Sequence, residues 1–137
     1  MSPELLKGRP SWISNQASRR NRPVRIVIQR TGAMLAGEAE VADTIIRRLI
    51  GLIGRDDIPG GTALVLPGVR QVHTFFMRFA IDLVYVDAEW RVLLTRRCVA
   101  PWRFGPYCAN AAYAIELRAG AISAAGIELG DQLEACE

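Results

Sequence analysis

Short apolar runs that end at turn-forming residues constrain the fold of this chain most strongly. Runs of about four to eight residues, bounded by Gly, Pro, Asn or Asp, are typical of β-strands. Near the N-terminal side, apolar and polar residues first alternate and a β-branched run follows, which also indicates a strand. The sequence therefore predicts strands at 24–28, 39–41, 63–66, 72–76, 83–86, 92–98, 112–116 and 132–135.

Two of these strands are joined by a short polar connection, Asp87-Ala88-Glu89-Trp90. A connection of this length is typical of a hairpin between antiparallel strands. We therefore expect 83–86 to pair with 92–95.

One segment, 43–53, has a helical period instead. Its Ile and Leu side chains fall on one side of a helical projection, and Arg47 and Arg48 fall on the other. Asp43 or Thr44 suits the N-cap, and Gly54 suits a left-handed exit. A further helical turn is expected within 120–129. Many strands, one amphipathic helix and no βαβ alternation predict a mainly β protein, an antiparallel β-sandwich or barrel with the helix packed on it.

The chain has 137 residues, a length that suits a single folded domain. Residues 1–22 contain five Lys or Arg residues without the apolar run of a signal peptide, which indicates a flexible basic arm. We expect the folded domain to span 23–137. No apolar stretch approaches the roughly 20 residues that a membrane-spanning helix needs, so no membrane association is expected.

Three cysteines, Cys98, Cys108 and Cys136, are widely spaced and form no C-x-x-C pair. This pattern argues against a zinc, iron–sulfur or disulfide framework and favours a reducing, cytoplasmic compartment. The net charge is +3, but five of the 17 basic residues lie in the arm. The folded part is then close to neutral, so nucleic acid is not an expected partner. Contact of the arm with nucleic acid or anionic lipid stays an alternative.

Chemically versatile residues concentrate in the stretch 73–82, HTFFMRFAID. It contains the only histidine, His73, together with Arg78 and Asp82. In a regular strand Arg78 and Asp82 would lie about 13 Å apart, so they converge only if the chain turns or bulges at 79–80. The alternative interpretation is structural, with Arg78 and Asp82 in an ion pair or turn and His73 at a sheet edge.

Several reaction classes are disfavoured by the sequence. A single histidine does not provide the two or three ligands of a typical zinc hydrolase. The chain contains neither a G-x-S-x-G elbow nor a Walker or G-x-G-x-x-G phosphate loop. We therefore expect no metal and no cofactor, and no catalytic residue is identified.

Other candidate ligand-binding residues flank that stretch. Glu116 lies at the edge of a predicted strand, where a carboxyl group suits acid–base work, with a turn or cap role as the alternative. Trp102 lies on a loop containing Pro and Gly, and its ring suits either ligand contact or loop packing. Arg55 and Phe76 complete the set as a cationic donor and an apolar wall.

Motifs in consistent order resemble the uncharacterised bacterial and archaeal family called domain of unknown function 192. The resemblance runs from about 43 to 133 and rests on GLIGR at 51–55, the stretch 73–82, and EL, AG, GI and GD between 116 and 131. Trp90 and Ala80 depart from it, where the family usually has glycine and often has proline. The resemblance implies a jelly-roll-type β-sandwich with a packed helix and implies no established activity.

Three hypotheses follow for the function. The leading one is a regulatory or binding module for a small polar or anionic ligand, with Arg55, Arg78 and His73 as donors and Phe76 or Trp102 as the apolar wall. The second is an enzyme that uses His73 or Asp82 as acid or base on a carbohydrate-like or other small substrate. The third is a protein-interaction domain.

Overall fold

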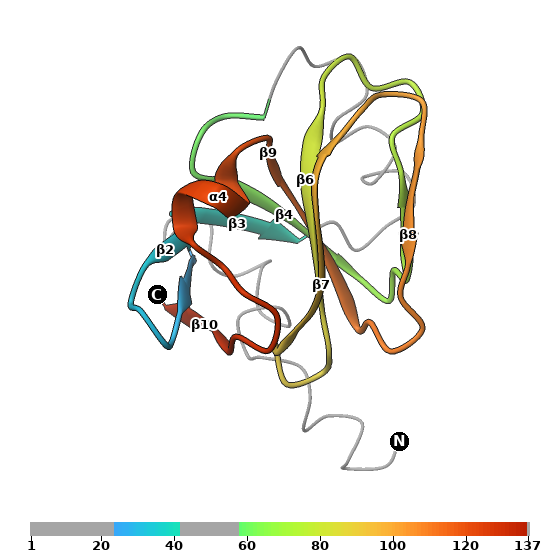
Figure 1. Ribbon diagram of the computed structural model, residues 1–137. Coiled ribbons are helices and arrows are strands. Elements are labelled where there is room, and N and C mark those ends of the chain that lie inside the picture. The colour runs from blue at the N-terminus through green and yellow to red at the C-terminus, as the bar shows by residue number, and fades with distance from the viewer. Residues whose placement is uncertain (1–23, 42–57, 137) are drawn as a thin grey trace.

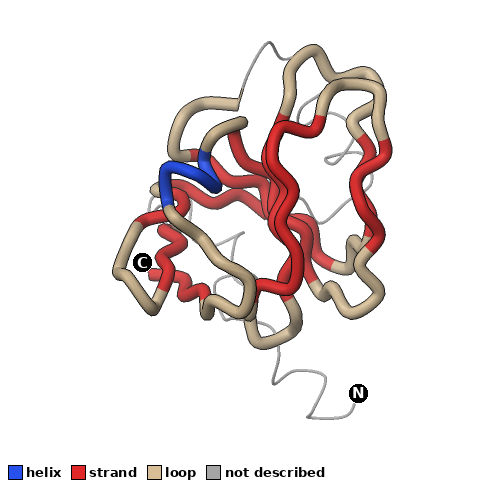
Figure 2. The backbone as a smooth tube through the Cα atoms, in the orientation of Figure 1, coloured by secondary structure: helices blue, strands red, loops and turns tan. Residues whose placement is uncertain are grey.

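The computed structural model describes residues 24–41 and 58–136 of the chain. They form mainly β-strands, with one short helix at the side of the sheets (Figures 1 and 2). In chain order the elements are β1 Arg25–Ile28, β2 Met34–Ala36, β3 Glu38–Val41, β4 Thr62–Pro67, β5 Gln71–His73, β6 Ile81–Val86, β7 Val92–Val99, β8 Phe104–Tyr107, β9 Tyr113–Arg118, α4 Ala121–Ala125 and β10 Leu133–Cys136.

A five-stranded sheet, in the order β3-β4-β9-β6-β7, forms the centre of the fold. Because side chains alternate along a strand, this sheet buries apolar residues on both faces. In β6, Val84 and Val86 belong to one core cluster, whereas Leu83 and Tyr85 belong to the other. Every residue of β6 is buried, which explains why its sequence is a continuous apolar run apart from Asp82.

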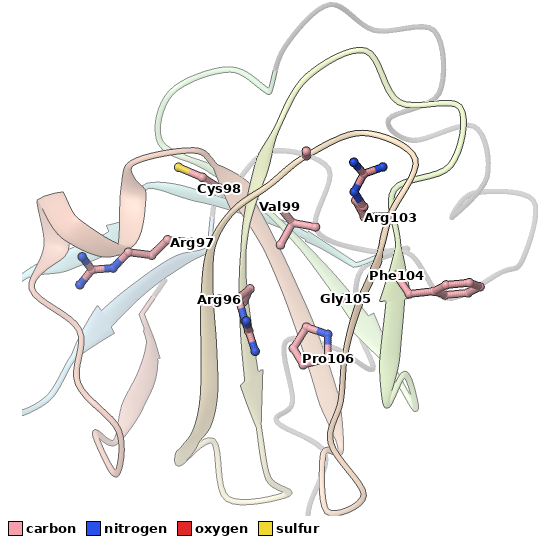
Figure 3. Close-up of a pocket in the computed structure, with 9 residues that line it drawn as sticks. Arg96, Arg97, Cys98, Val99, Arg103, Phe104, Gly105 and Pro106 are labelled. Carbon is pink, nitrogen blue, oxygen red and sulfur yellow. The ribbon is translucent and has the colours of Figure 1, made fainter.

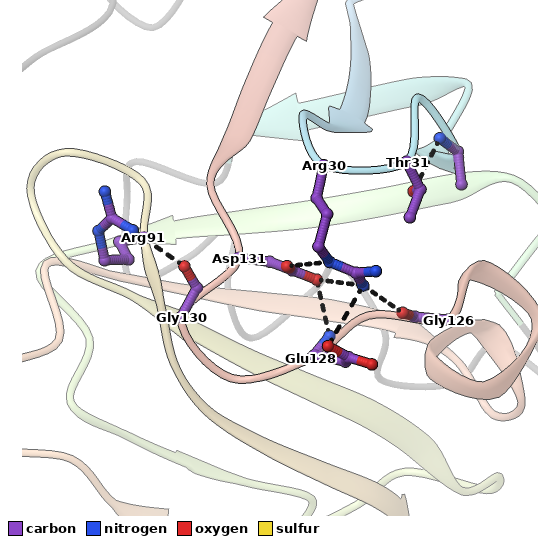
Figure 4. A network of polar contacts seen from close by, with 8 residues as sticks. Arg30, Thr31, Arg91, Gly126, Glu128, Gly130 and Asp131 are labelled. Atoms are coloured by element: carbon purple, nitrogen blue, oxygen red, sulfur yellow. Dashed lines mark hydrogen bonds and ion pairs between the residues drawn. The ribbon is translucent and has the colours of Figure 1, made fainter.

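The first face is covered by the three-stranded sheet β10-β1-β2 and by α4. Ile26 and Ile28 of β1 and Ile122 of α4 are almost fully buried there. Arg30 fastens this layer, because its guanidinium donates hydrogen bonds of 2.8 and 3.1 Å to the two carboxylate oxygens of Asp131 (Figure 4). The network joins the β1–β2 turn to the segment that leads into β10.

The second face is covered by a two-stranded ribbon of β5 and β8. Tyr85 of the central sheet ties the ribbon down: its hydroxyl donates to the carbonyl of Pro106 and accepts from the backbone N–H of Val72. Gly105 sits at the closest approach, where an added Cβ would lie 2.8 Å from Leu83 Cδ1. This contact requires a residue without a side chain.

Most of the expected elements are confirmed. The predicted strands correspond to β1, β3, β4, β5, β6, β7, β9 and β10, β6 and β7 form the predicted antiparallel hairpin, and α4 is the predicted helical turn. The helix expected at 43–53 and the arm at 1–22 lie outside the described residues.

Three details differ from the expectations. Two strands were not predicted, β2 and β8; β8 contains Gly105 and Pro106, which read locally as loop. The strand expected over 72–76 ends at His73, because the chain turns there. β3 and β4 pair in parallel, although the sequence showed no βαβ alternation.

Trp90 lies in the turn of the β6–β7 hairpin with an unusual backbone conformation. Its φ is 65°, in the left-handed region that glycine adopts without strain, and its side chain is 5% exposed. The ring packs 4.9 Å from that of Tyr113. The buried ring contact thus accompanies a backbone conformation that favours glycine.

Candidate functional site

Asp82 occupies a structural position on the face covered by α4. It is fully buried, and both of its carboxylate oxygens accept backbone N–H groups. Cys98 donates to Oδ1 at 2.9 Å, and Gly120 and Ile122 donate to Oδ2 at 3.1 and 3.0 Å. Asp82 therefore joins β6 to β7 and to the start of α4, and its bonds involve neither His73 nor Arg78.

His73 lies instead in a surface cluster that we call the aromatic face, formed by residues joined through ring contacts: His73, Phe75, Phe76, Trp102 and Phe104. His73 stacks on Phe75 with ring centroids 5.0 Å apart. Phe76 approaches Trp102 to 4.7 Å, so the structure brings together these two candidate residues. Arg78 is exposed on the same β5–β6 loop.

The aromatic face spans two loops that run side by side in Figure 1, β5–β6 and β7–β8. Thr74, fully buried, fastens them: its hydroxyl donates to the carbonyl of Ala100 at 2.6 Å and accepts from the N–H of Arg103 at 3.0 Å. Its carbonyl accepts the N–H of Trp102 at 2.9 Å. These hydrogen bonds join the backbones of the two loops beneath the side chains of the aromatic face.

Phe76 and Trp102 are both exposed and both have left-handed backbone, with φ of 65° and 63°. This conformation costs a residue with a side chain about 1–2 kcal/mol. Burial of the rings does not offset the cost, because the two side chains are 61% and 55% exposed. Strain held at exposed positions is typical of functional surfaces.

A pocket with a volume of about 510 Å³ lies between β7 and β8. Nine residues line it: Arg96, Arg97, Cys98, Val99, Ala100, Arg103, Phe104, Gly105 and Pro106. Figure 3 shows Arg96 and Val99 between the two strands, with Pro106 on the β8 side. Arg97 points the other way, toward α4, and Phe104 points outward from β8. The volume is within the range of small-molecule sites.

The pocket lining is cationic, with three arginines and no Asp or Glu. Within the part of the chain that the structure describes, the guanidinium groups of Arg96 and Arg97 form neither an ion pair nor a hydrogen bond. That of Arg103 donates to the carbonyl of Trp102 at 3.3 Å. An uncompensated set of this kind suits an anionic ligand.

Glu116 lies one strand beyond the pocket. In the central sheet it is opposite Leu83 and Leu64, and Leu83 is in turn opposite Arg96. The side chain is 6% exposed, and loss of hydration raises the pKa of its carboxyl group to about 8. Glu116 is therefore mostly protonated at neutral pH, and it neutralises none of the pocket arginines.

Arg96 and Arg103, which line the pocket with Val99 and Pro106, were not predicted as site residues from the sequence. A signal was present: 96–107 contains three arginines and no carboxylate. Arg55, one of the expected donors, lies outside the described residues.

Among residues 24–41 and 58–136, no three His, Cys, Asp or Glu side chains gather where a metal ion could bind. No helix in those ranges is long and apolar enough to cross a membrane.

Comparisons with known proteins agree on one family. The model of DUF192, described as "Uncharacterized ACR", matches residues 26–135. A UPF0127 protein of Thermococcus sibiricus is 30% identical over 80% of this chain and 73% of its own, and one of Pyrococcus furiosus is 37% identical over 71% and 85%. A crystal structure of a protein of unknown function from Novosphingobium aromaticivorans shares the fold, with a TM-score of 0.69, 19% identity, and coverage of 82% of this chain and 83% of that one. The chain belongs to the DUF192 family, whose function is not established.

Proposed function

We propose that this protein is a binding module for a small anionic ligand, held in the pocket between β7 and β8. The observation that carries the proposal is the pair Arg96 and Arg103 in a lining that contains no carboxylate; the third lining arginine, Arg97, points away toward α4 (Figure 3). Arg30, by contrast, forms an ion pair with Asp131. The pocket instead keeps its positive charge available.

The geometry suggests how the ligand is held. Arg96 lies between the strands, and its planar guanidinium suits two parallel hydrogen bonds to a phosphate or carboxylate group. Arg103 on the β7–β8 loop offers a second cation at the same pocket. Val99 and Pro106 provide an apolar surface for the rest of the molecule. A phosphorylated or carboxylated compound with a small apolar part fits this lining.

The proposal keeps the ligand class expected from the sequence and changes the donors. Arg96 and Arg103 replace His73 and Arg78, because those two are not among the residues that line the pocket. Asp82 has a structural role through its three backbone donors.

A thermal-shift assay tests the proposal with pyrophosphate and citrate as probes, against sodium chloride of equal ionic strength. A ligand at about 100 times its Kd stabilises the folded state by about 2.7 kcal/mol, which raises Tm by several degrees. We expect Arg96→Ala and Arg103→Ala to abolish the shift and Arg25→Ala, an exposed arginine on β1, to retain it. Equal shifts in all three variants would contradict the pocket assignment.

Acid–base catalysis is a second candidate, favoured by the buried Glu116 with its pKa of about 8. A carboxyl group with a pKa near the working pH suits proton transfer. Hydrolysis of p-nitrophenyl phosphate or p-nitrophenyl glycosides that disappears in Glu116→Gln would support it. Absence of turnover with both substrate classes would remove the candidate for them.

We also propose a cytoplasmic location. Cys98, Cys108 and Cys136 are free thiols, and Cys98 is exposed, which is the pattern of a reducing compartment. Fractionation of the native cell tests the location.

A further inference from the structure

We infer that the aromatic face binds single-stranded nucleic acid. The inference goes beyond the anion pocket, because it depends on the exposed rings of Phe76 and Trp102, although Phe104, Arg96 and Arg103 belong to both surfaces. Phe76 and Trp102 are not among the residues that line the pocket, so the two proposals can fail separately.

The first observation is the exposure of the rings. Phe76, Trp102 and Phe104 are 61%, 55% and 67% exposed, and Phe75 connects them through contacts of 4.8 Å to Phe104 and 6.1 Å to Trp102. The rings contact one another at tilted or edge-on angles between 32° and 72°, which leaves large parts of their surfaces exposed for stacking.

The second observation is the charge of the segments that carry the aromatic face. Residues 70–81 and 96–107 contain no Asp or Glu and five arginines, Arg70, Arg78, Arg96, Arg97 and Arg103. Of these, Arg97 points away toward α4 (Figure 3). Of the carboxyl groups nearest to these segments in the sequence, Asp82 is buried, and Asp87 and Glu89 lie on the β6–β7 turn. The near-neutral charge of the folded part, which argued against nucleic acid, therefore hides an uneven distribution of charge. Acidic side chains elsewhere in the described residues lie on β3, the β6–β7 turn and around β10.

The positive charge of these segments limits which partner can bind the aromatic face. A second copy of the chain placed face to face would oppose arginine to arginine, so self-association through this surface is disfavoured. The partner must carry negative charge and must also offer flat or apolar groups to the rings. Single-stranded nucleic acid does both, because its bases stack on aromatic rings while its phosphates contact arginines.

The polar side chains of the ribbon favour nucleic acid over an anionic lipid surface. On the outward side of β5 and β8, exposed Gln71 and His73 lie opposite Tyr107 and Phe104. Hydrogen-bonding side chains placed between stacking rings are useful for contacting base edges. In a membrane interface the same groups would have to lose hydration among acyl chains. Phe76 and Trp102 stay exposed although both have strained, left-handed backbone, which is typical of functional sites.

Fluorescence anisotropy on the full chain tests the inference. The probes are fluorescein-labelled oligothymidine and oligouridine of about 12 nucleotides, within the roughly 4–16 that one small domain covers. We expect binding at about 50 mM salt that weakens strongly at about 200 mM. Because each stacked base contributes substantially, Phe76→Ala and Trp102→Ala should each weaken binding roughly 5- to 100-fold.

Met34→Ala and Leu129→Ala are matched controls, because these side chains are 55% and 67% exposed and lie near the opposite side of the domain. Both controls should bind like the wild type, and an unchanged Tm in Phe76→Ala and Trp102→Ala separates lost stacking from lost folding. A duplex of the same length should bind more weakly, because its bases are already stacked.

Three results would overturn the inference. The first is no anisotropy change with either oligonucleotide at about 100 μM protein. The second is binding that Phe76→Ala and Trp102→Ala leave intact, which would assign it to basic residues elsewhere. The third is binding to phosphatidylserine vesicles, with a blue-shifted tryptophan emission lost in Trp102→Ala, in the absence of oligonucleotide binding.

Discussion

Replacing Asp82 by Asn tests the structural role assigned to its carboxylate. The wild-type side chain uses both oxygens, with Cys98 N–H on Oδ1 and the N–H groups of Gly120 and Ile122 on Oδ2. The amide of Asn has one acceptor oxygen, so its NH₂ group must face at least one backbone N–H in a fully buried position. The substitution therefore keeps the shape of the side chain but removes at least one of the three hydrogen bonds from backbone N–H groups.

The size of the effect follows from that geometry. A hydrogen bond to a charged group contributes about 1.5–3 kcal/mol, and a buried donor left unsatisfied costs a similar amount. We expect Asp82→Asn to lower the free energy of unfolding by about 2–3 kcal/mol, and Asp82→Ala, which leaves all three donors, by about 4–6 kcal/mol. With a urea m-value of about 2 kcal/mol per molar, the Asn variant should unfold at roughly 1 M less urea.

Urea unfolding followed by tryptophan fluorescence measures the change, because Trp90 is buried in the core. Asp87→Asn is the matched control: its donors, the N–H groups of Glu89 and Arg91, both bind Oδ1, which asparagine retains. That variant should stay within about 0.5 kcal/mol of the wild type. Equal midpoints for Asp82→Asn and Asp87→Asn would refute the reasoning, and Asp82 would again be free for ligand chemistry.

Three other substitutions test the packing, the backbone and the buried carboxyl group. Because the folded-state pKa of Glu116 is raised to about 8, the folded protein holds a proton that the unfolded chain releases above about pH 4.5. The free energy of unfolding should therefore fall as pH rises from about 4.5 to 8, and Glu116 should account for about 3 kcal/mol of that fall up to pH 7. Glu116→Gln should flatten the dependence of Tm on pH. Parallel pH profiles of Tm for the wild type and the variant would contradict this expectation. Gly105→Ala places a Cβ 2.8 Å from Leu83 Cδ1 and 3.0 Å from the Val72 carbonyl, so a loss of about 1–3 kcal/mol is expected in urea unfolding, and an unchanged midpoint would show that the ribbon shifts freely. Cys98, exposed at a φ of 51°, should tolerate glycine with an equal or slightly raised Tm, because relief of about 1–2 kcal/mol of strain exceeds or balances the added chain entropy; a lower Tm would mean the side chain contributes.

Local sequence pattern was sufficient for most of the fold. Continuous apolar residues marked β6, which is buried on both faces, and the polar connection after Val86 marked its hairpin with β7. The Ala and Ile residues within 120–129 indicated α4. In the structure the glycines on either side of 121–125 take left-handed backbone at its ends. These features depend on periodicity and turn chemistry within a few residues, which a sequence displays directly.

The candidate site depended on contacts between distant residues. β8 was hidden because Gly105 and Pro106 read as loop, and only its pairing with β5 makes it a strand. That pairing forms the pocket wall opposite Arg96 and places Phe104 beside Phe75.

Asp82 shows the same division between sequence and structure. The sequence by itself determined a mainly β domain of the DUF192 family and marked Asp82, in an aromatic stretch, as a candidate site residue. Only the tertiary structure decided that this carboxylate accepts N–H groups from β7 and the start of α4, 16 to 40 residues away. The physical reason is that side-chain alternation sends Asp82 and Leu83 to opposite faces of the sheet, and what covers each face depends on how the whole chain packs.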